Sequence, residues 1–86
     1  MAFTVEAGQV ISSTVVEHVR VRPGVAYVKF EACSKYSRVY INTEYDKAMY
    51  STALAAGVGK QSVSVEFNGP DCSLEELEML YLDIKF

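Results

Sequence analysis

The amino-acid sequence predicts a small, mainly β domain that contains one α-helix. Its 86 residues suffice for one hydrophobic core, so we expect a single domain over residues 1–86. Apolar and polar residues alternate with period two through most of the chain, which is typical of strands with one buried face. One alanine-rich stretch breaks this alternation and follows helical spacing instead.

The first expected strand spans residues 9–22 and is long. A strand of about 14 residues is expected to bend and to serve two sheets or close a barrel. It ends at Pro23-Gly24, a turn signal in which proline fixes φ and glycine allows a positive φ. The side chains expected to face the core are Ile11, Val15, Val19 and Val21.

Two further strands are expected over residues 25–33 and 38–42. The short turns that join these first three strands indicate an antiparallel meander. The side chains expected to face the core are Ala26, Val28, Phe30, Val39 and Ile41.

One helix is expected at about residues 44–57, after the third strand. Thr43 followed by Asp46 is typical of a capping box at the start of a helix. The alanines favour a helix that lies close to a sheet. We expect Gly57 and Gly59 to end the helix, one of them in the left-handed conformation.

Two more strands are expected over residues 62–68 and 79–86, so the order of elements is β-β-β-α-β-β. This is the order of the OB-fold, a five-stranded Greek-key barrel. The alternative is an open five-stranded sheet with the helix packed on one face. The last strand is expected to place Leu80, Leu82, Ile84 and Phe86 on one face.

The two cysteines, Cys33 and Cys72, predict one disulfide, because an even cysteine count in so small a domain fits an oxidising compartment. The alternative is a pair of buried free thiols in a cytosolic protein. We expect a secreted or periplasmic protein. Residues 1–6 lack a basic start followed by an apolar stretch, so we expect that an export signal was replaced at Met1 or Met1-Ala2.

Composition disfavours several functions. The net charge of −3 disfavours a general nucleic-acid binder, and no apolar run reaches the roughly 20 residues that span a membrane. His18 has no evident nucleophile and acid arranged around it, so we expect no enzyme and no cofactor. No metal site is expected either, because Glu75, Glu76 and Glu78 lack the spacing of a calcium loop.

The sequence resembles the B subunits of bacterial AB-type toxins, especially the subtilase-cytotoxin and typhoid-toxin branch and related small secreted proteins. The resemblance rests on Gly8–Ile11, Gly24–Val28, the run Ala48–Ala56 and the segment Gly59–Val65, with Cys33 and Cys72 in matching order. It implies a secreted OB-fold that assembles into a ring, usually a pentamer, and binds cell-surface glycans. It also raises a catalytic A subunit as a partner.

Two departures from that branch concern the known glycan pocket. Sialic-acid-binding members carry a serine just before the glycine that opens the first strand, whereas this chain has Ala7. Those members also have a loop with a tryptophan before the final strand, and this chain has no tryptophan. No binding residue is therefore carried over from the resemblance.

The tyrosines are the most informative polar residues, because a ring with a polar tip suits both sugar stacking and subunit interfaces. The residues that we expect to bind a ligand are Tyr27, Lys29, Tyr36 and Arg38. Those that we expect at an oligomer interface are Tyr40, Ser51, Thr52, Ala55 and Tyr81. The basic stripe of His18, Arg20 and Arg22, together with Lys29, suits an anionic sugar or a phosphate. We interpret it instead as pairing across strands with Glu17, Glu31 or Glu66.

The sequence leaves three candidate functions. The first is a secreted, ring-forming binding subunit that takes a glycan or a partner protein. The second is a small periplasmic or secreted structural or inhibitory protein that binds another protein and no sugar. The third, an OB-fold for single-stranded nucleic acid, needs a basic aromatic groove and is disfavoured by the acidic balance.

Overall fold

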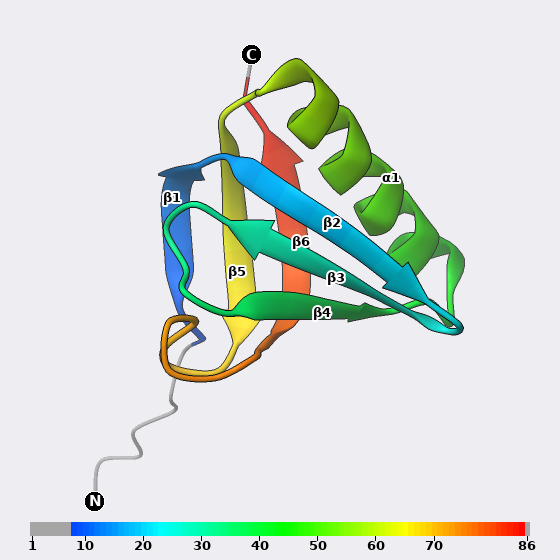
Figure 1. Ribbon diagram of the computed structural model, residues 1–86, viewed down its shortest axis with the longest axis horizontal. Helices are drawn as coiled ribbons and strands as arrows, with labels where there is room; N and C mark the ends of the chain where they lie inside the picture. The colour runs from blue at the N-terminus through cyan, green and yellow to red at the C-terminus, as the bar shows by residue number, and fades with distance from the viewer. Residues whose placement is uncertain (1–7, 86) are drawn as a thin grey trace, which may run out of the picture.

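The structure is a computed structural model that describes residues 8–85 and consists of one sheet and one helix (Figure 1). The elements are β1 (Val10–Thr14), β2 (Val16–Arg22), β3 (Val25–Phe30), β4 (Tyr36–Tyr40), α1 (Glu44–Gly59), β5 (Val63–Asn68) and β6 (Glu78–Ile84). The strand order is β1-β5-β6-β4-β3-β2, antiparallel except for the β4–β6 pair. The predicted mainly β fold with its helix before the last two strands is confirmed.

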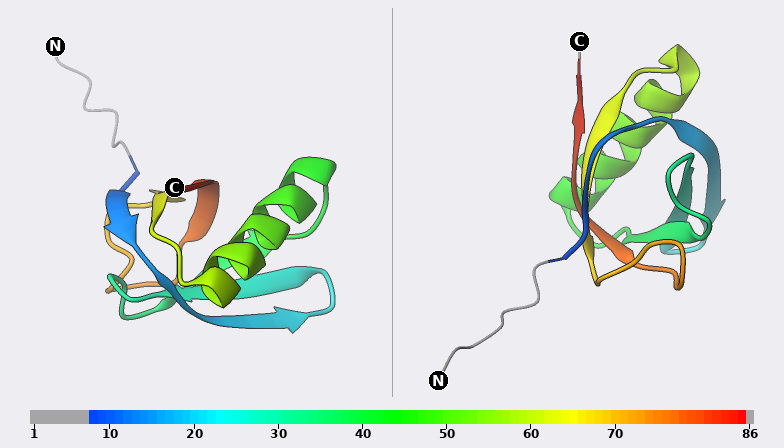
Figure 2. Two further views of the ribbon diagram at one scale, coloured as in Figure 1. Left: turned by 90° about the horizontal axis from the view of Figure 1, so that it is seen from above. Right: turned by 90° about the vertical axis from the view of Figure 1, so that its left-hand side faces the viewer.

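The long first strand that the sequence predicts is divided at Val15, so the described part of the chain has six strands in one sheet and not five. The segment before Val15 pairs with β5, and the segment after it pairs with β3. The chain therefore passes directly from one end of the strand order to the other (Figure 2). No ladder joins β1 to β2, so the sheet is not closed by strand pairing and the expected barrel stays a prediction.

The division at Val15 also changes which side chains face inward. Thr14 and Val16 are both buried, and Thr14 Oγ1 accepts a hydrogen bond of 3.1 Å from the backbone N–H of Ala32. Thr14 and Val16 are in phase with each other but not with Ile11 and Val19, which also pack against the core. The period-two alternation is therefore interrupted on both sides of Val15, where the strand pairing shifts register. The expectation that Val21 faces the core is wrong, since its side chain is 60% exposed.

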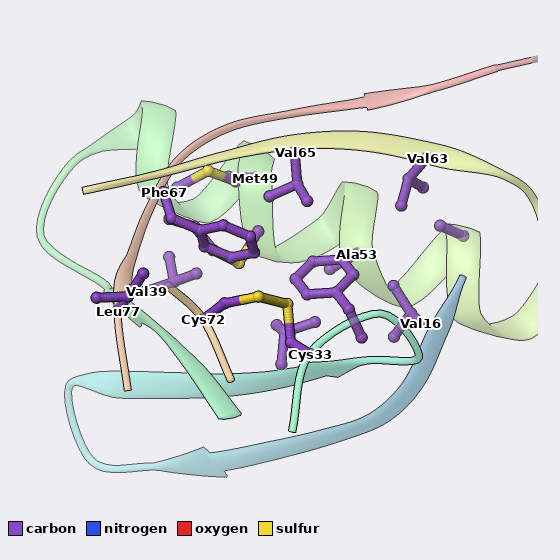
Figure 3. Packing of buried hydrophobic residues seen from close by; sticks show 14 of the residues in the cluster. Val16, Cys33, Val39, Met49, Ala53, Val63, Val65, Phe67, Cys72 and Leu77 are labelled. Carbon is purple, nitrogen blue, oxygen red and sulfur yellow. A yellow bond between two sulfur atoms is a disulfide. The ribbon is translucent and has the colours of Figure 1, made fainter. Parts of the chain in front are cut away.

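The core lies between α1 and the inner faces of the strands (Figure 3). Phe30 and Phe67 meet edge to face, with ring centroids 5.8 Å apart. Each is fully buried, which stabilises the fold by roughly 2–3 kcal/mol per ring. From α1 the buried residues are Met49, Ala53 and Ala56, and the two alanines let the helix approach the strands closely.

The start of α1 is the predicted capping box, and it is confirmed. Thr43 Oγ1 accepts from the backbone N–H of Asp46 at 3.1 Å, and the Asp46 carboxylate accepts from the N–H groups of Thr43 and Asn42 at 3.0 and 3.1 Å. These hydrogen bonds, led by that from Asn42, hold the pKa of Asp46 below its ordinary value.

The end of α1 differs from the sequence-based expectation. Gly57 and Gly59 are inside the helix, and Lys60 adopts the left-handed conformation with φ of 50°. The Lys60 N–H donates to Gly57 O, and the Gln61 N–H donates to Ala56 O, so the last helical carbonyls are satisfied without a glycine.

A β-bulge in β6 corrects the expected pattern of the last strand. Glu66 pairs with Tyr81 and Phe67 with Met79, so Leu80 is the extra residue. Met79 is buried in its place, and Leu80 is 41% exposed, contrary to the expectation that it faces the core. The two later leucine and isoleucine positions, Leu82 and Ile84, pack against the core as expected, and Phe86 lies outside the described residues.

The disulfide between Cys33 and Cys72 is present, with both residues buried and their Cα atoms 5.3 Å apart (Figure 3). It joins the loop after β3 to the loop between β5 and β6. Further hydrogen bonds reinforce this junction: the backbone N–H of Cys72 donates to Gln9 Oε1 at 2.7 Å, and that of Ser34 donates to Ser73 Oγ at 3.1 Å. A disulfide is compatible with an oxidising compartment.

Candidate ligand-binding face

The four residues that the sequence predicts as a ligand site lie together on one face of the sheet. In the antiparallel pair of β3 and β4, Tyr27 is opposite Arg38 and Lys29 is opposite Tyr36. Their neighbours in each strand are buried, so these four side chains point away from the core. Each of the four is half-buried, which is the exposure expected of side chains packed beside one another on an outer sheet face.

The neighbouring strand β2 adds a third row to this face. Its residue His18 is opposite Lys29, and Arg20 is opposite Tyr27. The left view of Figure 2 shows α1 on the other side of β2 and β3. We call the resulting surface the arginine–tyrosine face, and it contains all three arginines of the chain. Its members are His18, Arg20, Arg22, Tyr27, Lys29, Tyr36, Arg38 and Tyr40.

Two of the four cations on this face are held by the protein itself. Lys29 Nζ donates to Glu17 Oε1 at 3.0 Å and to the carbonyl of Phe30 at 2.8 Å. Arg38 Nη2 donates to the carbonyl of Glu76 at 3.0 Å, and its guanidinium carbon is 5.9 Å from the Tyr40 ring centroid. These contacts fix both side chains, and Glu17 neutralises the charge of Lys29.

The other two cations, Arg20 and Arg22, form no salt bridge within residues 8–85. The guanidinium carbon of Arg20 lies 5.1 Å from the centroid of Tyr36, a cation–π contact that orients the group without neutralising it. His18 meets the same tyrosine ring edge-on at 6.5 Å. The interpretation of the basic stripe as cross-strand ion pairs is therefore wrong for the two arginines.

A hollow of about 170 Å³ opens at the unpaired arginines. Two guanidinium groups, two tyrosine rings and one acidic residue form its wall, so the lining carries a formal charge of about +1 at neutral pH. The lining residues are Arg20, Arg22, Tyr27, Tyr36 and Glu76. This arrangement can stack a flat or apolar surface on a ring while donating charge-assisted hydrogen bonds to an oxyanion.

A larger hollow of about 520 Å³ lies between the start of β2 and the end of α1. No aromatic ring other than the His18 imidazole lines it, and its two carboxylates outnumber its single lysine. It therefore offers less for recognising a sugar or an anion. The lining residues are Val15, Val16, Glu17, His18, Glu31, Gly57 and Lys60.

The residues predicted at an oligomer interface lie on three different elements: α1, β4 and β6. Ser51 and Ala55 are exposed on α1, whereas Thr52 is half-buried and its hydroxyl donates to the carbonyl of Ala48 at 2.8 Å. Tyr40 belongs to the arginine–tyrosine face. Tyr81 lies on β6 opposite Glu66, away from the core. Oligomer formation stays a prediction.

Residues 8–85 contain neither a metal-binding cluster nor a membrane-spanning helix. No cluster of three or more histidine, cysteine, aspartate or glutamate residues is placed to hold a metal ion. The helix in this part of the chain is too short and too polar to cross a membrane. The expectations of no enzyme, no metal and no cofactor stay predictions.

Sequence reasoning considered Arg20 and Arg22 for an anionic ligand but favoured ion pairs across strands, although the hairpin register supports the ligand role. A two-residue turn at Pro23-Gly24 fixes the register of the hairpin around it. That register places Arg22 opposite Val25 and Arg20 opposite Tyr27. The alternation then puts both arginines on the same side as the predicted tyrosine.

Comparisons of the chain with family models, with curated proteins and with solved structures find no match.

Proposed function

We propose that this chain is a secreted, non-catalytic binding subunit, similar to toxin B subunits, that assembles into a ring and binds cell-surface glycan through the arginine–tyrosine face. One observation carries the proposal. Tyrosine rings and cationic side chains from three adjacent strands share a single outward surface with a hollow in it. The four residues expected from the sequence are all on that surface.

The chemistry of this face suits a sugar. The rings of Tyr27 and Tyr36 offer apolar surface against which the C–H face of a sugar can stack, and their hydroxyls can hydrogen-bond at the same time. The guanidinium groups supply several donors in a fixed geometry. Lys29 and Arg38 are held in place by internal contacts, so less conformational entropy is lost when a ligand is bound.

The same proposal includes the OB-type barrel. The two ends of the strand order, β1 and β2, are consecutive in the chain and meet at Val15, which is how a single bent strand would close such a barrel. In OB-folds the face of the second and third strands binds oligosaccharides and oligonucleotides. Those two strands correspond here to β3 and β4, which carry Tyr27 and Tyr36.

Export and ring assembly complete the proposal. The buried disulfide supports an exported protein. A shallow hollow of this size favours weak binding at each site, and a ring would convert several weak sites into tight attachment. The exposed side of α1, with Ser51 and Ala55, would supply contacts between subunits. Among possible rings we favour a pentamer, and we propose a catalytic A subunit as its partner.

The test is a glycan array read with the full chain, together with its mass in solution. We expect a ring mass and binding that the Tyr27→Ala and Tyr36→Ala variants weaken strongly. Tyr45→Ala is the matched control, because Tyr45 is an exposed tyrosine on α1, outside the face. A blank array for the oligomer, or equal binding by all three variants, would remove the glycan function from this face.

The second candidate is a secreted or periplasmic protein that binds another protein and no sugar. It is favoured by apolar side chains outside the arginine–tyrosine face: Val58 on α1 is 87% exposed, and Leu74 in the loop before β6 is 77% exposed. A chain that is monomeric in solution and silent on the array would favour this candidate over the first.

A further inference from the structure

We propose that the glycan is acidic, and that one of its sulfate or carboxylate groups occupies the hollow between Arg20 and Arg22. This inference rests on the proposed glycan function and names its substrate class. An acidic group on a sugar is an oxyanion with two or three acceptor oxygens, the partner that a guanidinium group binds bidentately.

The first support is the separation of charge in this chain. Its net charge is −3, yet four of its eight lysine and arginine residues lie on the arginine–tyrosine face. A positive surface on an acidic protein attracts anionic ligands to one place, because the rest of the molecule repels them. Neutral sugars gain nothing from this distribution of charge.

The second support is that Arg20 and Arg22 are uncompensated within residues 8–85. Glu17 is paired with Lys29, and Glu76, the carboxylate that lines the hollow, forms no salt bridge with either arginine. Arg20 is oriented by its contact with Tyr36, which leaves guanidinium hydrogens available toward the hollow. An incoming oxyanion would meet a positioned donor and would not have to displace an internal ion pair.

The third support is the size and layout of the site. At about 170 Å³ the hollow is smaller than the roughly 300 Å³ at which pockets begin to enclose drug-sized ligands. It therefore suits one acidic substituent and part of its sugar ring. Alternate residues of a strand are about 7 Å apart, so Arg20 and Arg22 present two positive groups along the edge strand β2. A linear sugar chain with repeating charges can follow this edge.

The experiment uses heparin as the probe, with the full chain in solution. The test variant is Arg20→Gln with Arg22→Gln, two exposed positions at which the fold should persist. The charge-matched control is Lys47→Gln with Lys60→Asn, on α1 and at its end, and asparagine tolerates the left-handed conformation at position 60. Thermal unfolding should show that both variants remain folded.

We expect heparin binding by the wild type and the control within about twofold of each other, and roughly tenfold weaker binding for each arginine removed. Binding should also weaken as salt is raised. Desulfated heparin, which keeps its carboxylates, and carboxyl-reduced heparin, which keeps its sulfates, distinguish the two acidic groups: the one that the hollow prefers is the one whose removal costs more affinity.

Several outcomes would overturn the inference. Unchanged heparin binding in the arginine variant would do so, as would equal array binding of neutral and acidic glycans, which would leave the proposed glycan function standing. Tighter binding of an oligothymidine strand than of heparin would replace the glycan with single-stranded nucleic acid. Absence of binding to any sugar would instead reject the proposed function itself.

Discussion

Removal of the disulfide should destabilise this domain strongly. Cys33 and Cys72 are 39 residues apart, and cross-linking them restricts the unfolded chain by about 13 cal/mol/K in the chain-entropy expression, or about 4 kcal/mol at 25 °C. Both residues are fully buried, so Cys33→Ala with Cys72→Ala also loses the packing of two sulfur atoms, roughly 1 kcal/mol each. The sum is comparable with the whole stability of a small domain, about 5–15 kcal/mol.

Urea titration measures this loss. The chain has no tryptophan, so far-UV circular dichroism is the suitable signal. With a slope of about 1 kcal/mol per molar urea, reduction of the wild type should lower the midpoint by roughly 3–4 M. The alanine pair should fall somewhat further and should not respond to reductant. A reduced wild type that keeps its midpoint within about 0.5 M of the oxidised protein would refute this reasoning.

Four further substitutions test the fold. Thr43→Ala should cost about 1 kcal/mol of stability in urea titration, because it removes half of the capping box. The lowered pKa of Asp46 adds stability above its unfolded pKa that is lost as pH falls below about 4, so Asp46→Asn should flatten this acid dependence. Ser37→Ala should raise stability by about 1 kcal/mol, because Ser37 Oγ is buried and has no hydrogen-bond partner within residues 8–85. Gly69→Ala should cost about 1–3 kcal/mol, because φ is 152° there and the added Cβ would collide with Leu77 Cδ2.

Each of these four predictions has a result that would contradict it. A Thr43→Ala variant as stable as the wild type would mean that the capping box contributes nothing to α1. If the stability of Asp46→Asn fell with acid as steeply as that of the wild type, Asp46 would not be the source of this pH dependence. A loss of stability in Ser37→Ala would show that the hydroxyl has a partner. A neutral Gly69→Ala substitution would show that the loop before β6 adapts easily.

Much of the fold could be predicted because local chemistry determines it. Alternation in residues 25–30 fixes which side of β3 is buried, and Thr43 with Asp46 marks the helix start using neighbours only a few residues apart. The disulfide follows from cysteine count and domain size. The strand face and the helix start need no knowledge of distant partners, and two cysteines allow only one pairing.

The sequence-based predictions are wrong where burial depends on contacts with distant residues, or where two neighbouring apolar residues could each be buried. The phase changes on the two sides of Val15 accompany a long-range contact, in which the Ala32 N–H donates to the Thr14 hydroxyl 18 residues away. At the bulge, Met79 and Leu80 are both apolar, so hydrophobicity alone cannot say which of them is buried. Lys60 ends the helix in the left-handed conformation although two glycines precede it.

For the candidate site, the sequence predicts which residues share the face, but it does not predict which of the cations have partners within the protein. Tyr27, Lys29, Tyr36 and Arg38 share a face because alternation and short turns place them there. Which cations remain available depends on long-range contacts: Arg38 is held by the carbonyl of Glu76, 38 residues away. Because those contacts hold Lys29 and Arg38, the cations left available for a ligand are the two arginines of β2, Arg20 and Arg22.

The most direct test of the binding face is an NMR titration of the isotope-labelled chain with a heparin tetrasaccharide. The account predicts chemical-shift changes at backbone amides of residues 18–29 and 36–40 and at the Nε–Hε groups of Arg20 and Arg22, with α1 left unperturbed. Shifts confined to α1 or to the β5–β6 pair would place the ligand elsewhere and contradict the central claim.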